Sequence, residues 1–109
     1  MSIRTKILVV DNDLATLSRI YLALVHRNYK VEASDKPEET IERIRRFKPS
    51  LLIIGSNEFK TLNTSFKIPC ILLYDKGMKD GITGDDEIFP LENPVPIETL
   101  VMLIDELVI

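Results

Sequence analysis

The residues of this sequence best suited to chemistry are acids and amides that follow apolar runs. Asp11, Asn12 and Asp13 directly follow the apolar run Ile7–Val10, and Asp75 follows another such run. Carboxylate and amide oxygens are the ligands that hard cations such as Mg²⁺ take in proteins. Asp11, Asp13 and Asp75 are therefore candidate cation ligands. Helix capping is the competing explanation for Asp11, Asn12 and Asp13, because Asp and Asn are favoured caps.

Other reactive side chains are sparse. His26 is the only histidine and Cys70 the only cysteine, and Cys70 lies inside the apolar run Ile68–Leu73. A free cysteine in such a run is usually a small core residue, and nucleophilic catalysis needs a base within reach of the nucleophile. The sequence therefore predicts neither an enzyme nor a bound cofactor.

Length and composition are those of a globular protein. The 109 residues suit a single domain spanning 1–109. The net charge of -3 argues against a nucleic-acid partner, because such partners are bound through clustered positive charge. No apolar run approaches the roughly 18 residues of a membrane span, and the N-terminus lacks the apolar core of a signal peptide. We expect a cytoplasmic domain with no membrane partner.

The first half of the chain alternates between strand and helix patterns. Unbroken apolar runs at Lys6–Val10 and Leu51–Ile54 predict strands that are covered on both faces. Lys30–Ala33 predicts a shorter strand between them. Leu14–Arg27 predicts a helix. Its expected core face comprises Leu14, Leu17, Tyr21, Leu24 and Val25.

A second helix is expected before the strand at Leu51. It begins at Ser34 or Asp35, with Pro37 in its first turn, and ends before Pro49. Its expected core face comprises Ile41, Ile44 and Phe47. Strands alternating with helices indicate a parallel sheet with helices on both faces.

The second half is less regular. Ser56–Lys67 has room for only a short helix before a strand at Cys70–Tyr74. Asp75–Asp86 contains three glycines and clustered charges, which argue against a stable helix. We therefore expect the helices of this half to be shortened or lost.

The C-terminal segment predicts a last strand and a last helix. The strand is short, around Glu87–Phe89, and Pro90 and Pro94 bracket a turn after it. The helix covers Ile97–Leu107. Its expected core face comprises Ile97, Leu100, Val101, Ile104 and Val108.

The phrases KILVVDND, KPSLLIIG, IPCILLYD and ENPVPIETL occur in the order seen in receiver domains of two-component response regulators. The chain resembles that family over nearly its whole length. The resemblance implies an α/β, flavodoxin-like (CheY-like) fold. Its doubly wound five-stranded parallel sheet has the order 2-1-3-4-5, and here the third and fourth helices are shortened or lost. The site of such a sheet lies at the carboxyl ends of its strands.

The resemblance assigns five positions to the family's phosphorylation site. The acidic pair corresponds to Asp11-Asn12, the phosphoacceptor aspartate to Gly55, the switch hydroxyl to Tyr74 and the lysine to Asn93. Glycine cannot act as a nucleophile, and asparagine carries no positive charge. Only Asp11 keeps the family's residue, so we expect a vestigial site with no phosphoacceptor.

The replacements have ordinary structural explanations. Gly55 suits a turn that requires a positive φ. The Tyr74 ring is expected to fill the vacated pocket or to pack over the edge of the sheet. No lysine lies between Lys79 and the C-terminus, so a shift in alignment would not restore the missing charge.

A receiver without its acceptor is expected to act by binding. The resemblance implies a pseudo-receiver, a phosphorylation-independent interaction module in bacterial signal transduction. Its partner would be a histidine kinase, an output domain or a localisation factor, and a homodimer is a further option. The candidate docking residues are Phe89, Leu91, Met102 and Leu103, although isolated exposed apolar residues are common. The alternative is a cation- or small-ligand-responsive switch that uses the acidic cluster.

Overall fold

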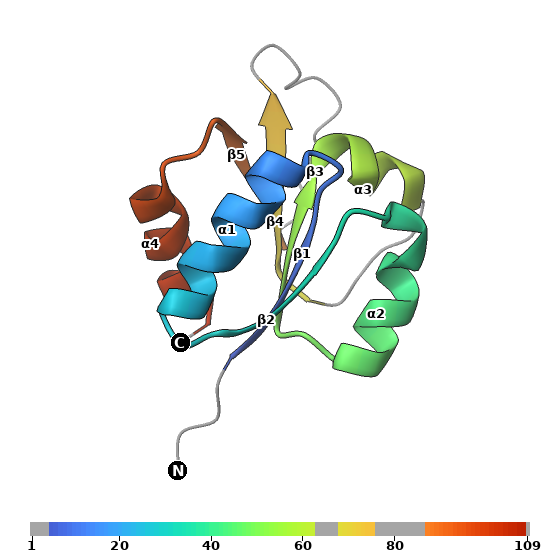
Figure 1. Ribbon diagram of the computed structural model, residues 1–109, viewed down its shortest axis with the longest axis horizontal. Helices are drawn as coiled ribbons and strands as arrows, with labels where there is room; N and C mark the ends of the chain where they lie inside the picture. Colours follow the sequence, from blue (N-terminus) through green and yellow to red (C-terminus); the bar gives the residue numbers. More distant parts are fainter. Residues whose placement is uncertain (1–4, 63–67, 76–86, 109) are drawn as a thin grey trace.

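The protein is described by a computed structural model over residues 5–62, 68–75 and 87–108 (Figure 1). One five-stranded parallel sheet has the order β2-β1-β3-β4-β5. Its strands are β1 Lys6–Val10, β2 Lys30–Ser34, β3 Leu51–Gly55, β4 Cys70–Asp75 and β5 Ile88–Asn93. The predicted parallel sheet and its strand order are confirmed.

Helices cover both faces of this sheet, with α1 and α4 on one side and α2 and α3 on the other (Figure 1). They are α1 Leu14–His26, α2 Thr40–Phe47, α3 Ser56–Leu62 and α4 Ile97–Leu107, with a 3₁₀ turn at Pro37–Glu39 before α2. None of the helices in the described ranges is long and apolar enough to cross a membrane.

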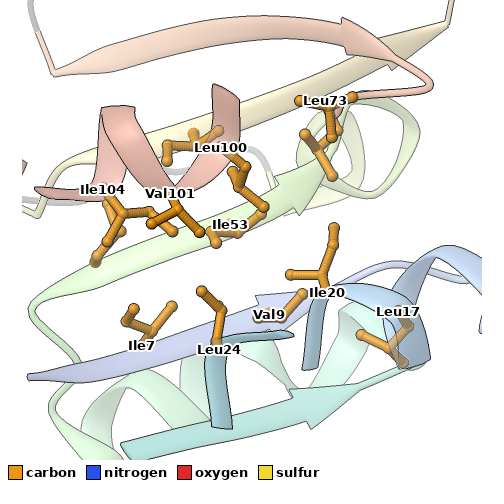
Figure 2. Packing of buried hydrophobic residues seen from close by; sticks show 13 residues of the cluster. Ile7, Val9, Leu17, Ile20, Leu24, Ile53, Leu73, Leu100, Val101 and Ile104 are labelled. Atoms are coloured by element: carbon orange, nitrogen blue, oxygen red, sulfur yellow. The ribbon is translucent and has the colours of Figure 1, made fainter. Parts of the chain in front are cut away.

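Two apolar cores follow from the alternation of side chains along the strands. Ile7 and Val9 of β1 face the larger core, under α1 and α4, while Leu8 and Val10 face the smaller one. Figure 2 shows residues of the larger core interdigitating between the sheet and these two helices. The strands therefore have unbroken apolar sequences because both of their faces are covered.

Helix α1 buries a different face from the one expected. Leu17, Ile20 and Leu24 are buried against the sheet, whereas Leu14, assigned to the core from sequence, is 60% exposed. Tyr21 and Val25 are also exposed, so these three assignments were wrong. The helix is apolar on two adjacent faces, and periodicity alone cannot identify which of them meets the sheet.

Helix α2 differs from its prediction in a smaller way. It begins at Thr40, after the 3₁₀ turn, rather than at Ser34 or Asp35. Phe47 is buried and Ile44 packs against the smaller core, but Ile41 is exposed. A helix of eight residues contributes few side chains to the core.

Strand β5 is longer than predicted. It runs from Ile88 to Asn93, so Pro90 lies within the strand and not at the start of a turn. Proline lacks an N–H to donate to a neighbouring strand, and such a residue is tolerated at the edge of a sheet. β5 is an edge strand and pairs only with β4, so a proline-based turn was the wrong inference.

The predicted shortening of the later helices is only partly visible. Helix α3 follows β3 without an intervening residue and has seven residues. The segment 76–86, for which we expect no helix, lies outside the described residues.

Candidate functional site

A cleft of about 490 Å³ opens at the carboxyl ends of the strands. The loop after β1, the start of α3 and the ends of β4 and β5 contribute to its lining. Its lining residues include Asp11, Asn12, Asp13, Arg19, Gly55, Glu58, Asp75 and Asn93. The sheet thus brings together four of the five positions assigned to a phosphorylation site, and Tyr74 does not line the cleft.

Asp11 is anchored at the end of β1. It is 6% exposed, and its N–H donates a hydrogen bond to the backbone oxygen of Ser34 at 3.1 Å. Its Oδ1 accepts a hydrogen bond from the N–H of Asp13 at 2.9 Å. The pKa of Asp11 is raised to about 6, mainly because burial disfavours the charged carboxylate. The hydrogen bond from the Asp13 N–H lowers this pKa, and the negative charges of Glu58, Asp13 and Asp75 raise it.

Gly55 leaves a space that the side chain of Glu58 fills. A Cβ built at Gly55 would collide with Glu58 Oε2, and it would lie 3.2 Å from Glu58 Cδ and 3.4 Å from Asp11 Oδ2. The φ of Gly55 lies outside the left-handed region, so the expected requirement for a positive φ is wrong. Glycine is favoured here by the close approach of a carboxylate.

Glu58 is the site residue that the sequence analysis missed. Its side chain is 4% exposed, and its Oε1 accepts a hydrogen bond from the N–H of Asn12 at 3.1 Å. It lies in the first turn of α3, three residues after Gly55. An acid in the first turn of a helix is favoured by the helix dipole, so an acid in the first turn after a strand that ends in glycine was the available signal.

Asp13 occupies the N-cap position of α1 without capping the backbone. No side-chain bond to the first helical N–H groups forms at this end. Instead, the Oδ2 of Asp13 accepts a hydrogen bond from Thr16 Oγ1 at 2.5 Å. From the sequence, one of the residues 11–13 is expected to cap the helix. Instead, the Asp11 side chain accepts the Asp13 N–H and forms a turn before the helix.

Asp75 and Asn93 join the ends of β4 and β5. They are partners in the strand register, and Asn93 Nδ2 donates to Asp75 Oδ1 at 3.2 Å. The Asn93-Pro94 peptide is cis. The other amide atom, Asn93 Oδ1, is buried and has no hydrogen-bond partner in the structure as described.

Tyr74 does not fill the vacated site. Its neighbours in β4, Leu73 and Asp75, both line the cleft. Because successive side chains of a strand point to opposite faces, Tyr74 belongs to the other face. The expectation that its ring fills the pocket is wrong, since Glu58 takes that space.

The charges of the cleft are mainly negative. The acids Asp11, Asp13, Glu58 and Asp75 line it together with one cation, Arg19, and none of the described lysines does. The Arg19 guanidinium donates to the backbone oxygen of Val95 at 2.9 Å. Across the described ranges, no three or more His, Cys, Asp or Glu side chains are grouped so that they could hold a metal ion.

Solved structures with the same architecture are receiver domains. A candidate response regulator from Chloroflexus aurantiacus is 19% identical, with a TM-score of 0.80 over 96% of this chain and 98% of the other. A signal receiver domain from Bermanella marisrubri is 21% identical, with a TM-score of 0.74 over 98% and 100%. A receiver-modulated diguanylate cyclase from Pelobacter carbinolicus is 23% identical, with a TM-score of 0.68 over 94% and 92%.

The chain has the receiver fold. No protein-family profile and no curated protein sequence matches it. Identities this low establish the architecture and leave the activity to be argued from the site.

In this receiver fold, the four candidate docking residues differ in how far they are exposed. Phe89, Leu91 and Leu103 are half-buried and pack against the larger core. Met102 is 67% exposed. The turn expected to present Phe89 and Leu91 to a partner is part of β5, and its apolar side chains help to close the core.

Proposed function

We propose that this chain is a pseudo-receiver, a phosphorylation-independent protein-interaction module of bacterial signal transduction that works in the cytoplasm. The observation that carries the proposal is the exchange at the acceptor position. Gly55 supplies no side chain, and the buried carboxylate of Glu58 occupies the space above it. A phosphoryl group entering the cleft would find no aspartate at position 55 to join, and the space where such a side chain would begin is taken by Glu58.

The electrostatics of the cleft support the same conclusion. Phosphoryl transfer needs a bound cation and positive donors to offset the charge of the phosphoryl oxygens. Here the carboxylates of Asp11, Asp13, Glu58 and Asp75 line the cleft. They would repel the phosphoryl group, and Asn93, at the position matched to the family's lysine, brings no positive charge.

Binding is the function left to a receiver fold without phosphoryl chemistry. The receiver-modulated diguanylate cyclase among the similar structures pairs this fold with an output activity. We infer that the present chain likewise acts on a protein partner, such as a histidine kinase or an output domain, through its folded surface.

The test is phosphorylation by a small donor. Incubation of the purified protein with acetyl phosphate and Mg²⁺ should leave the intact mass unchanged. Beryllofluoride, a mimic of the aspartyl phosphate, should leave the NMR signals of Asp11, Gly55 and Asn93 unmoved. A gain of one phosphoryl mass would overturn the proposal.

The matched variant Glu58→Gln keeps the shape of the side chain and removes its acid. A mass gain that disappears in this variant would identify Glu58 as a displaced acceptor, which also contradicts a silent site. An unmodified mass in both proteins, measured beside an active receiver as a positive control for the donor, is the expected result.

A further inference from the structure

Helix α1 carries a second apolar stripe that the described parts of the chain leave largely exposed. Leu14, Tyr21, Leu22 and Val25 are 60%, 37%, 56% and 42% exposed. Together with Ser18, the positions 14, 18, 21 and 25 alternate spacings of four and three residues. This alternation is the spacing of a helix that packs along another helix, and it lies beside the stripe that faces the sheet.

A groove next to this stripe is also apolar. It has a volume of about 500 Å³ and lies between α1 and the edge strand β2. Leu17, Leu22, Val31 and Ala33 contribute its apolar lining, with Arg43 at one side. Arg43 is already paired with Glu32 at 3.1 Å, so the groove offers mainly contact area to an incoming side chain.

The two ends of α1 have opposite charge. Exposed Asp13 precedes the helix, and exposed His26 and Arg27 end it. A helix that pairs with a copy of itself in the antiparallel direction places its acidic end beside the basic end of the other. The helix dipoles then also oppose one another favourably. This charge pattern is complementary to itself and specifies the direction of the partner.

We propose that α1 forms a symmetric homodimer by packing antiparallel against α1 of a second copy of this chain. A two-fold axis that crosses the helix between Ser18 and Tyr21 makes every contact between the two copies occur twice. The small Ser18 then faces the Tyr21 ring of the other copy, and Leu14 faces Val25. The same register brings Leu22 of each copy over the groove of the other.

The interface consists mainly of one helix face, so it belongs to the small, weakly held class. A dissociation constant on the order of micromolar is expected for such a contact. The inference does not depend on the proposed silence of the cleft, because the apolar side chains of the stripe do not line it. A phosphorylatable protein could form the same dimer.

Sedimentation velocity over a concentration series tests the interface. The protein should pass from monomer to dimer as its concentration rises. Leu22→Glu places an unpaired charge in the seam and should shift the midpoint at least tenfold to higher concentration. Leu22 is more than half exposed, so this variant should still fold. Ile41→Glu, an equally drastic change at an exposed residue of α2 on the other face of the sheet, should leave the midpoint unchanged.

Disulfide trapping tests the register. Ser18→Cys and Tyr21→Cys proteins mixed under oxidising conditions should form a covalent dimer faster than either protein alone. The native Cys70 is buried and does not compete. Faster trapping of Ser18→Cys with itself would overturn the antiparallel register. A wild-type protein that stays monomeric at every accessible concentration would mean that the stripe serves a different protein, and it would overturn the dimer.

Discussion

At the scale of single residues, Gly55 and Glu58 act as a pair. The carboxylate of Glu58 lies where a side chain at position 55 would begin, and it accepts the N–H of Asn12. The residue type at each of the two positions depends on the residue type at the other. A side chain at position 55 would have to displace a buried acid, and an acid at position 58 needs the space that glycine leaves.

The raised pKa of Asp11 predicts how the stability of the protein depends on pH. Its pKa is about 6 in the folded protein against 3.8 in the unfolded chain, so between these values the folded state binds more protons. The free energy of unfolding should therefore fall as the pH rises through this window. Asp11→Asn keeps an acceptor for the Asp13 N–H and should stabilise the protein by about 1 to 3 kcal/mol above pH 6.

Urea unfolding at several pH values measures this difference. The advantage of Asp11→Asn should shrink toward zero below the unfolded-state pKa, where Asp11 is protonated in both states. Asp35→Asn, which removes an exposed carboxylate, controls for the loss of one negative charge. An Asp11→Asn protein that is less stable than the wild type at neutral pH would show that the carboxylate is stabilising.

At the scale of elements, some apolar residues of β5 and α4 pack in the core and others are exposed to solvent. Leu91 packs against the larger core from the edge strand, whereas Met102 is exposed on α4. The distinction matters because both were candidate docking residues. A core residue affects every function through stability, while an exposed one can affect binding alone.

Alanine substitutions separate these two roles. Leu91→Ala should lower the free energy of unfolding by about 1 to 3 kcal/mol, because it removes partly buried methyl groups. Met102→Ala should change it by less than about 0.5 kcal/mol. Chemical denaturation measures both values. Equal losses in the two variants would contradict the assignment of Leu91 to the core and Met102 to the surface.

At the scale of the whole molecule, the parallel strands end at one edge of the sheet (Figure 1), and the acidic side chains of the cleft gather there. The arrangement concentrates negative charge in a chain whose net charge is already -3. Such a concentration of negative charge could attract a cation, as the alternative function of a cation-responsive switch requires. Asp11, Asp13 and Asp75 are its candidate ligands, and their oxygens are partly committed to Asp13 N–H, Thr16 and Asn93.

Thermal melting decides whether the domain responds to cations. A ligand that binds only the folded state must raise the melting temperature. We expect millimolar Mg²⁺, Mn²⁺ or Ca²⁺ to change it by less than about 1 °C relative to sodium chloride of equal ionic strength. A saturable rise with one of these cations, absent in an Asp11→Asn protein, would favour the cation-responsive switch.

Local pattern was enough to predict β1 to β4, whereas the strand order and the expected loss of the acceptor rested on the resemblance to receiver domains. Runs such as Leu51–Ile54 are apolar on both faces, which only a covered parallel strand requires. The expected lack of a nucleophile follows from glycine at position 55, but only the resemblance assigned the acceptor role to that position. Strand patterns depend on residue type and on neighbours in sequence, so they can be recognised without knowledge of the fold.

Tertiary structure alone decided which groups share the cleft and which apolar faces are covered. Leu14 and Ile20 are both apolar residues of α1, and only the placement of the helix on the sheet buries Ile20 and exposes Leu14. Glu58 is one acid among many until α3 begins directly after β3 and turns its carboxylate over Gly55. The sequence determined the elements, because helices and strands arise from local periodicity. Their packing determined the site, because proximity across the sheet is a property of the folded chain.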